Sequence, residues 1–275
     1  MIYKEAKMSM QTPIKAITTT QIVKKKGVEK ITMITAYDAL MAKIFDGEVD
    51  MILVGDSLQM SFFGERDTLS ATLEQMIYHT KAVCNGARQS LIICDMPFGS
   101  TTTSKMALES AIKVYQETKA QAIKLEVGLE GLQSVQMLTE NGIAVMAHIG
   151  LKPQFVRGEG GYKVQGKTQE SIESLIKLAK EVEQRGAFSI LLEGVKAEAA
   201  RAIAQSVGIP IIGIGSGVDV DGQVLVWSDA FGFFEEFKPK FVRRYLQGAE
   251  LLRGALREYV KEVKNSQFPS VDESY

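Results

Sequence analysis

Eight short apolar runs recur along the 275-residue chain. They occupy residues 31–35, 51–55, 91–94, 122–125, 143–147, 189–192, 210–214 and 223–227. Continuous apolar runs of this length are typical of strands that are buried on both faces. Most of the segments between them carry helical periodicity, as at 73–87, 104–120 and 169–187. The pattern therefore predicts strands that alternate with helices.

This alternation indicates a parallel sheet covered by helices. Eight strand–helix units favour closure into a (β/α)8 TIM barrel over an open, doubly wound sheet, and 275 residues are compatible with a single domain spanning 1–275. The interval from 215 to 223 is too short for a full helix, so an open sheet or an irregular barrel is the alternative.

The two ends of the chain depart from the strand–helix pattern. Residues 1 to about 20 are expected to form an N-terminal extension. Apolar residues at 241–263 share one helical face, which predicts an extra C-terminal helix that closes the barrel or meets a neighbouring subunit. Residues from about 265 to 275 lack periodicity and contain a proline, so we expect a mobile tail.

Composition excludes several classes of function. The 32 basic and 33 acidic residues leave a net charge of -1, which provides no global basic field for nucleic acid. Cys84 and Cys94 lack zinc-site spacing and are expected to be reduced core thiols. With two histidines in the chain, a metal would use mainly oxygen ligands. No signal-like or membrane-spanning run is present in the sequence, so we expect a cytoplasmic protein without membrane contacts.

Candidate chemistry lies where the predicted strands end, because barrel enzymes carry their reactive groups at the C-terminal ends of the strands. Side chains alternate along a strand, so Lys124 should face the barrel interior together with Glu126. The polar residues at the strand ends are Asp56, Ser57, Asp95, Glu126, His148 and Glu193.

Four carboxylates at one rim indicate a functional cluster, although any single aspartate could serve as a helix cap or a turn residue. Carboxylate oxygens suit Mg²⁺, which normally binds one or two of them directly. An inward Lys124 implies a salt-bridge network or a bound anionic ligand. His148 fits a hydrogen-bonded core residue and a site residue equally well, whereas His79 is expected to be structural or at an interface.

Two glycine-rich loops leave alternatives open. The loop at 213–217 could bind phosphate through its backbone, but tight packing explains it as well. The segment 150–167 is long for a connection between a strand and a helix and rich in glycine, which suits a lid or an ordered wall of the site, with an ordinary flexible loop as the alternative.

Eight short motifs together closely resemble the ketopantoate hydroxymethyltransferase family. They are TAYD (35–38), VGDSL (54–58), DMPF (95–98), IKLE (123–126), GGYKVQG (160–166), LLE (191–193), PIIGIGSG (210–217) and DGQVLV (221–226). The resemblance extends from about Ile31 to about Tyr259. Departures from the family pattern occur at Val127, Lys196 and Ser216 and remove no carboxylate.

The resemblance implies a homo-oligomeric, often decameric, TIM-barrel enzyme of pantothenate biosynthesis. Its members use Mg²⁺ and 5,10-methylenetetrahydrofolate to hydroxymethylate 3-methyl-2-oxobutanoate, which gives 2-dehydropantoate. Carried over by motif, the metal ligands are Asp56, Asp95 and Glu126, the substrate contacts are Asp56, Ser57, Asp95 and Lys124, and the proton acceptor is Glu193.

Two other hypotheses belong to different functional classes. One is a Mg²⁺-dependent barrel lyase or mutase that acts on another 2-oxo acid or on phosphoenolpyruvate. The other is a structural or interaction protein that has the barrel fold of an enzyme family but no catalytic activity. Folate-dependent product formation would separate the first from a hydroxymethyltransferase, and the second should bind no 2-oxo acid in a metal-dependent way.

Overall fold

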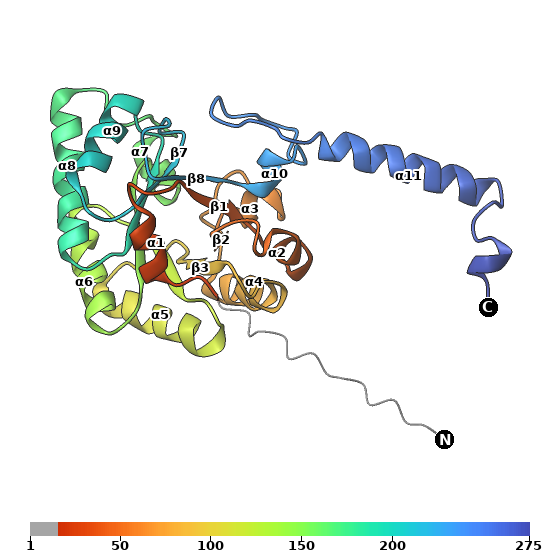
Figure 1. Cartoon of the computed structure of the whole chain (residues 1–275), viewed down its shortest axis with the longest axis horizontal. Coiled ribbons are helices and arrows are strands. Elements are labelled where there is room, and N and C mark those ends of the chain that lie inside the picture. The colour runs from red at the N-terminus through yellow and green to blue at the C-terminus, as the bar shows by residue number, and fades with distance from the viewer. Residues whose placement is uncertain (1–15) are drawn as a thin grey trace, which may run out of the picture.

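The computed structural model describes residues 16–275 and contains a closed barrel of eight parallel strands (Figure 1). The strands follow one another around the barrel in chain order, and β8 pairs with β1 to close it. They are β1 (Ile31–Thr35), β2 (Met51–Val54), β3 (Leu91–Asp95), β4 (Ala122–Glu126), β5 (Val145–Gly150), β6 (Ser189–Glu193), β7 (Ile211–Ile214) and β8 (Gly222–Leu225). The predicted TIM barrel is confirmed, and the open sheet is wrong.

Helices surround the barrel on the outside (Figure 1). The longer ones are α2 (Ala39–Phe45), α4 (Leu73–Gly86), α5 (Ser104–Glu117), α6 (Leu132–Glu140), α8 (Gln169–Gln184) and α9 (Ala197–Ser206). Thr72, Thr103 and Thr168 cap α4, α5 and α8 by accepting hydrogen bonds from the first-turn backbone. Between β7 and β8 the fully described connection contains no helix, as its length predicts.

The strands separate two apolar cores. Ile123 and Leu125 pack with the helices, whereas Ala122 belongs to the cluster inside the barrel. This alternation turns Lys124 and Glu126 inward, as expected. Helix α1 (Thr19–Lys25) closes the end of the barrel opposite the strand C-termini, where fully buried Ile22 joins the interior cluster. The rest of the expected N-terminal extension, residues 1–15, lies outside the described residues.

The C-terminal helix α11 (Gly248–Lys264) begins at Gly248, later than the amphipathic pattern predicts. Tyr245 N donates to Ala230 O at 2.7 Å and Gly248 N donates to Phe231 O at 2.8 Å, so these amides bond to the preceding segment instead of continuing a helix. Helix α11 projects away from the barrel (Figure 1), so the prediction that it closes the barrel of its own chain is wrong.

The residues that follow α11 include a short 3-10 turn, η3 (Val271–Glu273). Mobility of this tail stays a prediction. No helix within residues 16–275 combines the length and apolar character needed to cross a bilayer.

Candidate active site

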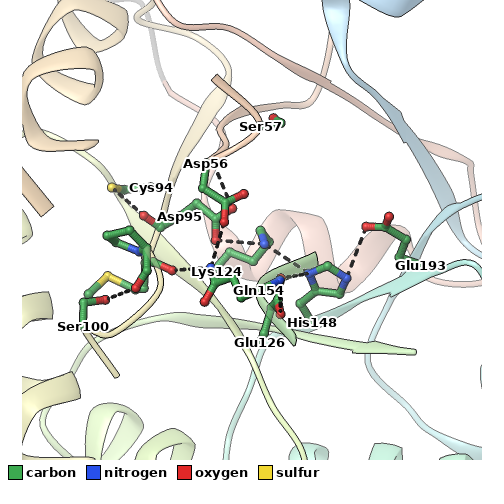
Figure 2. Close-up of polar contacts among 12 residues, drawn as sticks. Asp56, Ser57, Cys94, Asp95, Ser100, Lys124, Glu126, His148, Gln154 and Glu193 are labelled. Atoms are coloured by element: carbon green, nitrogen blue, oxygen red, sulfur yellow. Dashed lines mark hydrogen bonds and ion pairs between the residues drawn. The ribbon is translucent and has the colours of Figure 1, made fainter. Parts of the chain in front are cut away.

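A cavity of about 490 Å³ opens at the C-terminal ends of the strands. It is lined by every residue that the sequence placed at this rim, namely Asp56, Ser57, Asp95, Lys124, Glu126, His148 and Glu193. They come from the C-terminal ends of β2, β3, β4, β5 and β6. Figure 2 shows the carboxylates, Lys124 and His148 gathered together, with Ser57 a little apart. The strand-end pattern therefore identified one connected cluster.

An ion pair lies at the inner end of this cluster. Lys124 Nζ is 2.8 Å from Asp95 Oδ1, and both side chains are almost completely buried. Burial raises the pKa of Asp95 to about 8, against the opposing effect of Lys124. Burial would lower the pKa of Lys124, but the nearby carboxylates raise it above its ordinary value. Lys124 therefore stays charged, and a second cation would favour ionised Asp95 further.

Neutral His148 lies between Lys124 and Glu193 (Figure 2). Lys124 Nζ lies 3.2 Å from His148 Nδ1, and because an ammonium can only donate, Nδ1 accepts and Nε2 carries the ring proton. Burial, followed by the charge of Lys124, holds the pKa of His148 well below its usual value. His148 Nε2 lies 3.4 Å from Glu193 Oε2 but forms no hydrogen bond with it. The histidine is thus a site residue that faces the carboxylate of Glu193.

Glu193 differs from the other carboxylates in its exposure. Its side chain is 20% exposed, whereas those of Asp95 and Glu126 are 1% and 2% exposed. Burial still raises the pKa of Glu193 to about 7, with Lys124 opposing the shift. A carboxyl group with this pKa, facing an open cavity, is suited to accept a proton near neutral pH.

Gln154 joins two of the carboxylates and was not identified from the sequence. Its backbone N–H donates to both oxygens of Glu126, at 3.2 and 3.1 Å, and its Nε2 donates to Asp56 Oδ2 at 2.8 Å. Nε2 also donates to Met96 O at 2.9 Å. Gln154 belongs to the long segment 150–167, which contributes Tyr162 and Val164 to the lining of the cavity, so the segment forms part of its wall.

Hydrogen bonds behind the site explain the positions of Ser57 and His79. Tyr37 is fully buried, and its hydroxyl lies 2.8 Å from Ser57 Oγ. His79 Nδ1 lies 2.6 Å from the backbone oxygen of Tyr37. His79 therefore supports the residues beside the cavity and does not line it, which agrees with the structural role expected for it.

Close packing explains why glycine occurs in the loop at 213–217. A Cβ at Gly217 would lie 2.7 Å from Ala197 Cβ, and one at Gly213 would lie 2.9 Å from a Val220 methyl group. Ser216 Oγ donates to Leu192 O at 2.8 Å and accepts from Val195 N at 3.2 Å. The loop thus braces the end of β6, where Glu193 is located.

The carboxylates fit Mg²⁺ as a partial ligand set. Within residues 16–275, no group of three or more His, Cys, Asp or Glu side chains is arranged to hold a metal ion alone. Asp56 and Asp95 adjoin each other, since Asp56 N donates to Asp95 Oδ2 at 3.2 Å. Two carboxylates completed by substrate oxygens and waters are a usual Mg²⁺ environment. Glu126, engaged by Gln154 N, fits contact through water.

A parallel barrel whose strand ends bring a lysine, a neutral histidine and several carboxylates into one cavity defines a TIM-barrel enzyme. The family model of ketopantoate hydroxymethyltransferase matches residues 16–271. The chain belongs to this family and is a hydroxymethyltransferase. This membership implies a role in pantothenate biosynthesis.

Relatives named 3-methyl-2-oxobutanoate hydroxymethyltransferase cover nearly the whole chain. The Wolinella succinogenes protein is 62% identical over 95% of this chain and 100% of its own length. The Helicobacter pylori protein is 56% identical over 98% of this chain and 100% of its own.

Solved structures with a similar barrel are much more distant in sequence. Phosphonopyruvate hydrolase in complex with oxalate and Mg²⁺ has a TM-score of 0.61 at 13% identity and covers 93% of each chain. A 2,3-dimethylmalate lyase of the PEP mutase/isocitrate lyase superfamily has a TM-score of 0.59 at 14% identity, covering 96% of this chain and 89% of its own. These likenesses concern the fold alone.

Proposed function

We propose that the protein transfers a hydroxymethyl group from 5,10-methylenetetrahydrofolate to C3 of 3-methyl-2-oxobutanoate, giving 2-dehydropantoate. Membership of the family supports the reaction. The observation that carries the mechanism is the position of Glu193, whose carboxyl has a pKa of about 7 and faces the same cavity as the Lys124–Asp95 pair. A weak carbon acid needs a base near its C–H group and positive charge near the oxygen on which negative charge develops.

The inner end of the cavity suits the carboxylate and ketone of a 2-oxo acid. Lys124 supplies a buried positive charge, and the Ser57 hydroxyl can donate a hydrogen bond. Asp56 and Asp95 would hold Mg²⁺ directly and Glu126 would hold it through water. When bound, Mg²⁺ would accept the ketone and carboxylate oxygens and offset the negative charge that develops as the C3 proton leaves.

Glu193 is the proton acceptor in this proposal. His148 keeps its ring proton on Nε2 and lies beside Glu193, with Nε2 3.4 Å from Oε2, so a neutral ring borders the carboxylate. With its proton on Glu193, C3 attacks the methylene carbon carried by the folate, and a C–C bond forms. The methylene carbon bridges two folate nitrogens, so one C–N bond breaks as the C–C bond forms, and water then replaces the second C–N bond and supplies the hydroxyl oxygen of the product. The proton held by Glu193 and one proton of the water go to the two folate nitrogens, and tetrahydrofolate leaves.

The proposal is tested by assaying purified protein with both substrates, in Mg²⁺ and in excess chelator. Product should form only with the folate and Mg²⁺ present. In a second assay without folate, deuterium at C3 of 3-methyl-2-oxobutanoate should wash out. Exchange that persists undiminished in chelator would refute the role of Mg²⁺, and conversion of a 2-oxo acid or phosphoenolpyruvate without folate, with no 2-dehydropantoate formed when folate is added, would favour a lyase or mutase.

We also propose a cytoplasmic homo-oligomer, with the decamer as the expected assembly. The family resemblance supports both statements. Sedimentation equilibrium of the full chain would test the assembly, and a monomer at micromolar concentration would refute it.

A further inference from the structure

The outer part of the active-site cavity is aromatic, in contrast to its charged inner end. The aromatic rings come from two distant parts of the sequence, the wall segment 150–167 and the segment 231–247 that follows the short helix α10 (Trp227–Ala230). We call this set the aromatic mouth; it consists of Tyr162, Phe234, Phe237 and Phe241. Phe237 is 67% exposed and Tyr162 is 51% exposed. Exposed rings at a cavity entrance favour a flat, partly aromatic ligand.

One further carboxylate lines the same cavity. It is neither part of the cluster around the Lys124–Asp95 ion pair nor the proposed base, Glu193. Asp229, on α10, lines the cavity, and burial raises its pKa to about 6 despite the opposing charge of Arg244. Across residues 16–275 no side-chain hydrogen bond or ion pair reaches the Asp229 carboxylate. A partly buried acceptor without donors would be stabilised by a ligand that offers two adjacent N–H groups.

A reduced folate carries groups that match Asp229, the aromatic mouth and Lys240. The 2-amino group and N3–H of its pterin are adjacent donors that can meet a carboxylate side by side. Its p-aminobenzoyl ring is flat and apolar, which suits contact with phenylalanine and tyrosine rings. Its glutamate tail is anionic, and Lys240, which is exposed and also lines the cavity, provides a positive charge.

The position of these groups also suits the transfer step. Glu193 and the aromatic mouth line one continuous cavity. A one-carbon donor held at the mouth would therefore present its methylene group toward the carbon from which Glu193 removes a proton. Proximity of this kind is a requirement for direct transfer between two bound molecules.

Resting on the function proposed above, we infer that the aromatic mouth is the folate subsite. Asp229 receives the donors of the pterin ring, the rings of the mouth contact the pterin and p-aminobenzoyl groups, and Lys240 pairs with the glutamate carboxylates.

The test uses two variants, Asp229→Asn and Phe237→Ala. Because Phe237 is mostly exposed, its truncation removes little core packing. Tetrahydrofolate binding is measured by calorimetry with Mg²⁺ and 3-methyl-2-oxobutanoate present, and C3 deuterium exchange is measured without folate. Each variant should raise the Kd for tetrahydrofolate and the KM for methylenetetrahydrofolate by about tenfold, the change that follows from losing about 1.4 kcal/mol of binding free energy. C3 exchange should stay within about twofold of wild type.

Matched controls lie outside the cavity. Asp272→Asn removes an exposed carboxylate in η3, and Tyr78→Ala removes an exposed ring on α4. Both controls should keep the wild-type Kd for tetrahydrofolate.

The outcomes separate this inference from the proposed function. If the wild type fails to exchange C3 deuterium and forms no product, the proposed function is refuted. If the wild type performs both reactions but the two variants keep the wild-type Kd and KM for the folates, the folate subsite is refuted and the proposed function stands. Loss of C3 exchange in either variant would also overturn the subsite, because the residue would then act on the 2-oxo acid.

Discussion

The pH dependence of C3 exchange should follow the ionisation of Glu193. Only the carboxylate form can accept a proton, and burial raises the pKa of this group to about 7. A group with that pKa is about 9% ionised at pH 6, about 50% at pH 7 and about 91% at pH 8. The exchange rate should therefore increase about tenfold from pH 6 to pH 8. His148 adds nothing to this profile, because its pKa lies well below 6.5 and the ring is already neutral.

The assay follows the loss of deuterium from C3 by NMR, at saturating Mg²⁺ and 3-methyl-2-oxobutanoate. The companion variant is Glu193→Gln, which keeps the shape of the side chain but removes the base. Positioned bases contribute about 10²- to 10⁴-fold, so exchange and overall turnover should fall together by that range, and the residual rate should lose its dependence on pH. Binding of the 2-oxo acid should persist in this variant, because Lys124 and Asp95 remain.

Two results would refute this reasoning. A wild-type rate that is flat between pH 6 and pH 8 would show that Glu193 does not titrate in the way its burial indicates. A Glu193→Gln variant that retains exchange but loses ligand binding would make Glu193 a binding residue, with His148 the first alternative for the base.

Three further substitutions test the metal site and the framework. Asp95→Asn should weaken Mg²⁺ binding in calorimetry with little loss of stability, and unchanged affinity with wild-type turnover would remove Asp95 from the ligands. Gln154→Met should lower the free energy of unfolding in urea by about 2–4 kcal/mol, because Asp56 and Met96 O lose buried donors; an unchanged midpoint would contradict this. Ile22→Ala should cost about 2–4 kcal/mol through a cavity in the barrel, yet leave C3 exchange unchanged, since α1 lies at the opposite end.

Much of the barrel and its site was predictable because periodicity constrains parallel strands strongly. A strand buried on both faces must be a short apolar run, and its C-terminal end must face the same rim as those of its neighbours. Alternation then required Lys124 and Glu126 to share the interior, as the structure shows. The same rule applied to the eighth strand would have reached Asp229, which follows β8 by a few residues.

Other features depend on contacts that leave no local pattern. Gln154 reaches Asp56 across 98 residues of sequence, and its surroundings in a glycine-rich loop do not mark it as polar and buried. The start of α11 was misplaced because amides near Tyr245 bond to the segment after α10, a long-range choice that helical periodicity cannot indicate. The amphipathic pattern predicted an apolar helix face but not the direction in which the helix would extend.

The arrangement around Lys124 explains how neighbouring carboxylates can perform different tasks in one cavity. Asp95 contacts the ammonium directly, whereas Glu193 lies beyond His148 (Figure 2). Because Coulombic effects weaken with distance, a divalent cation at Asp56 and Asp95 would lower the pKa of Asp95 far more than that of Glu193. Asp95 would then remain an anionic ligand, while Glu193 would keep a pKa suited to taking and returning a proton. Neutral His148 maintains this difference, since a second positive charge beside Glu193 would make it a weaker base.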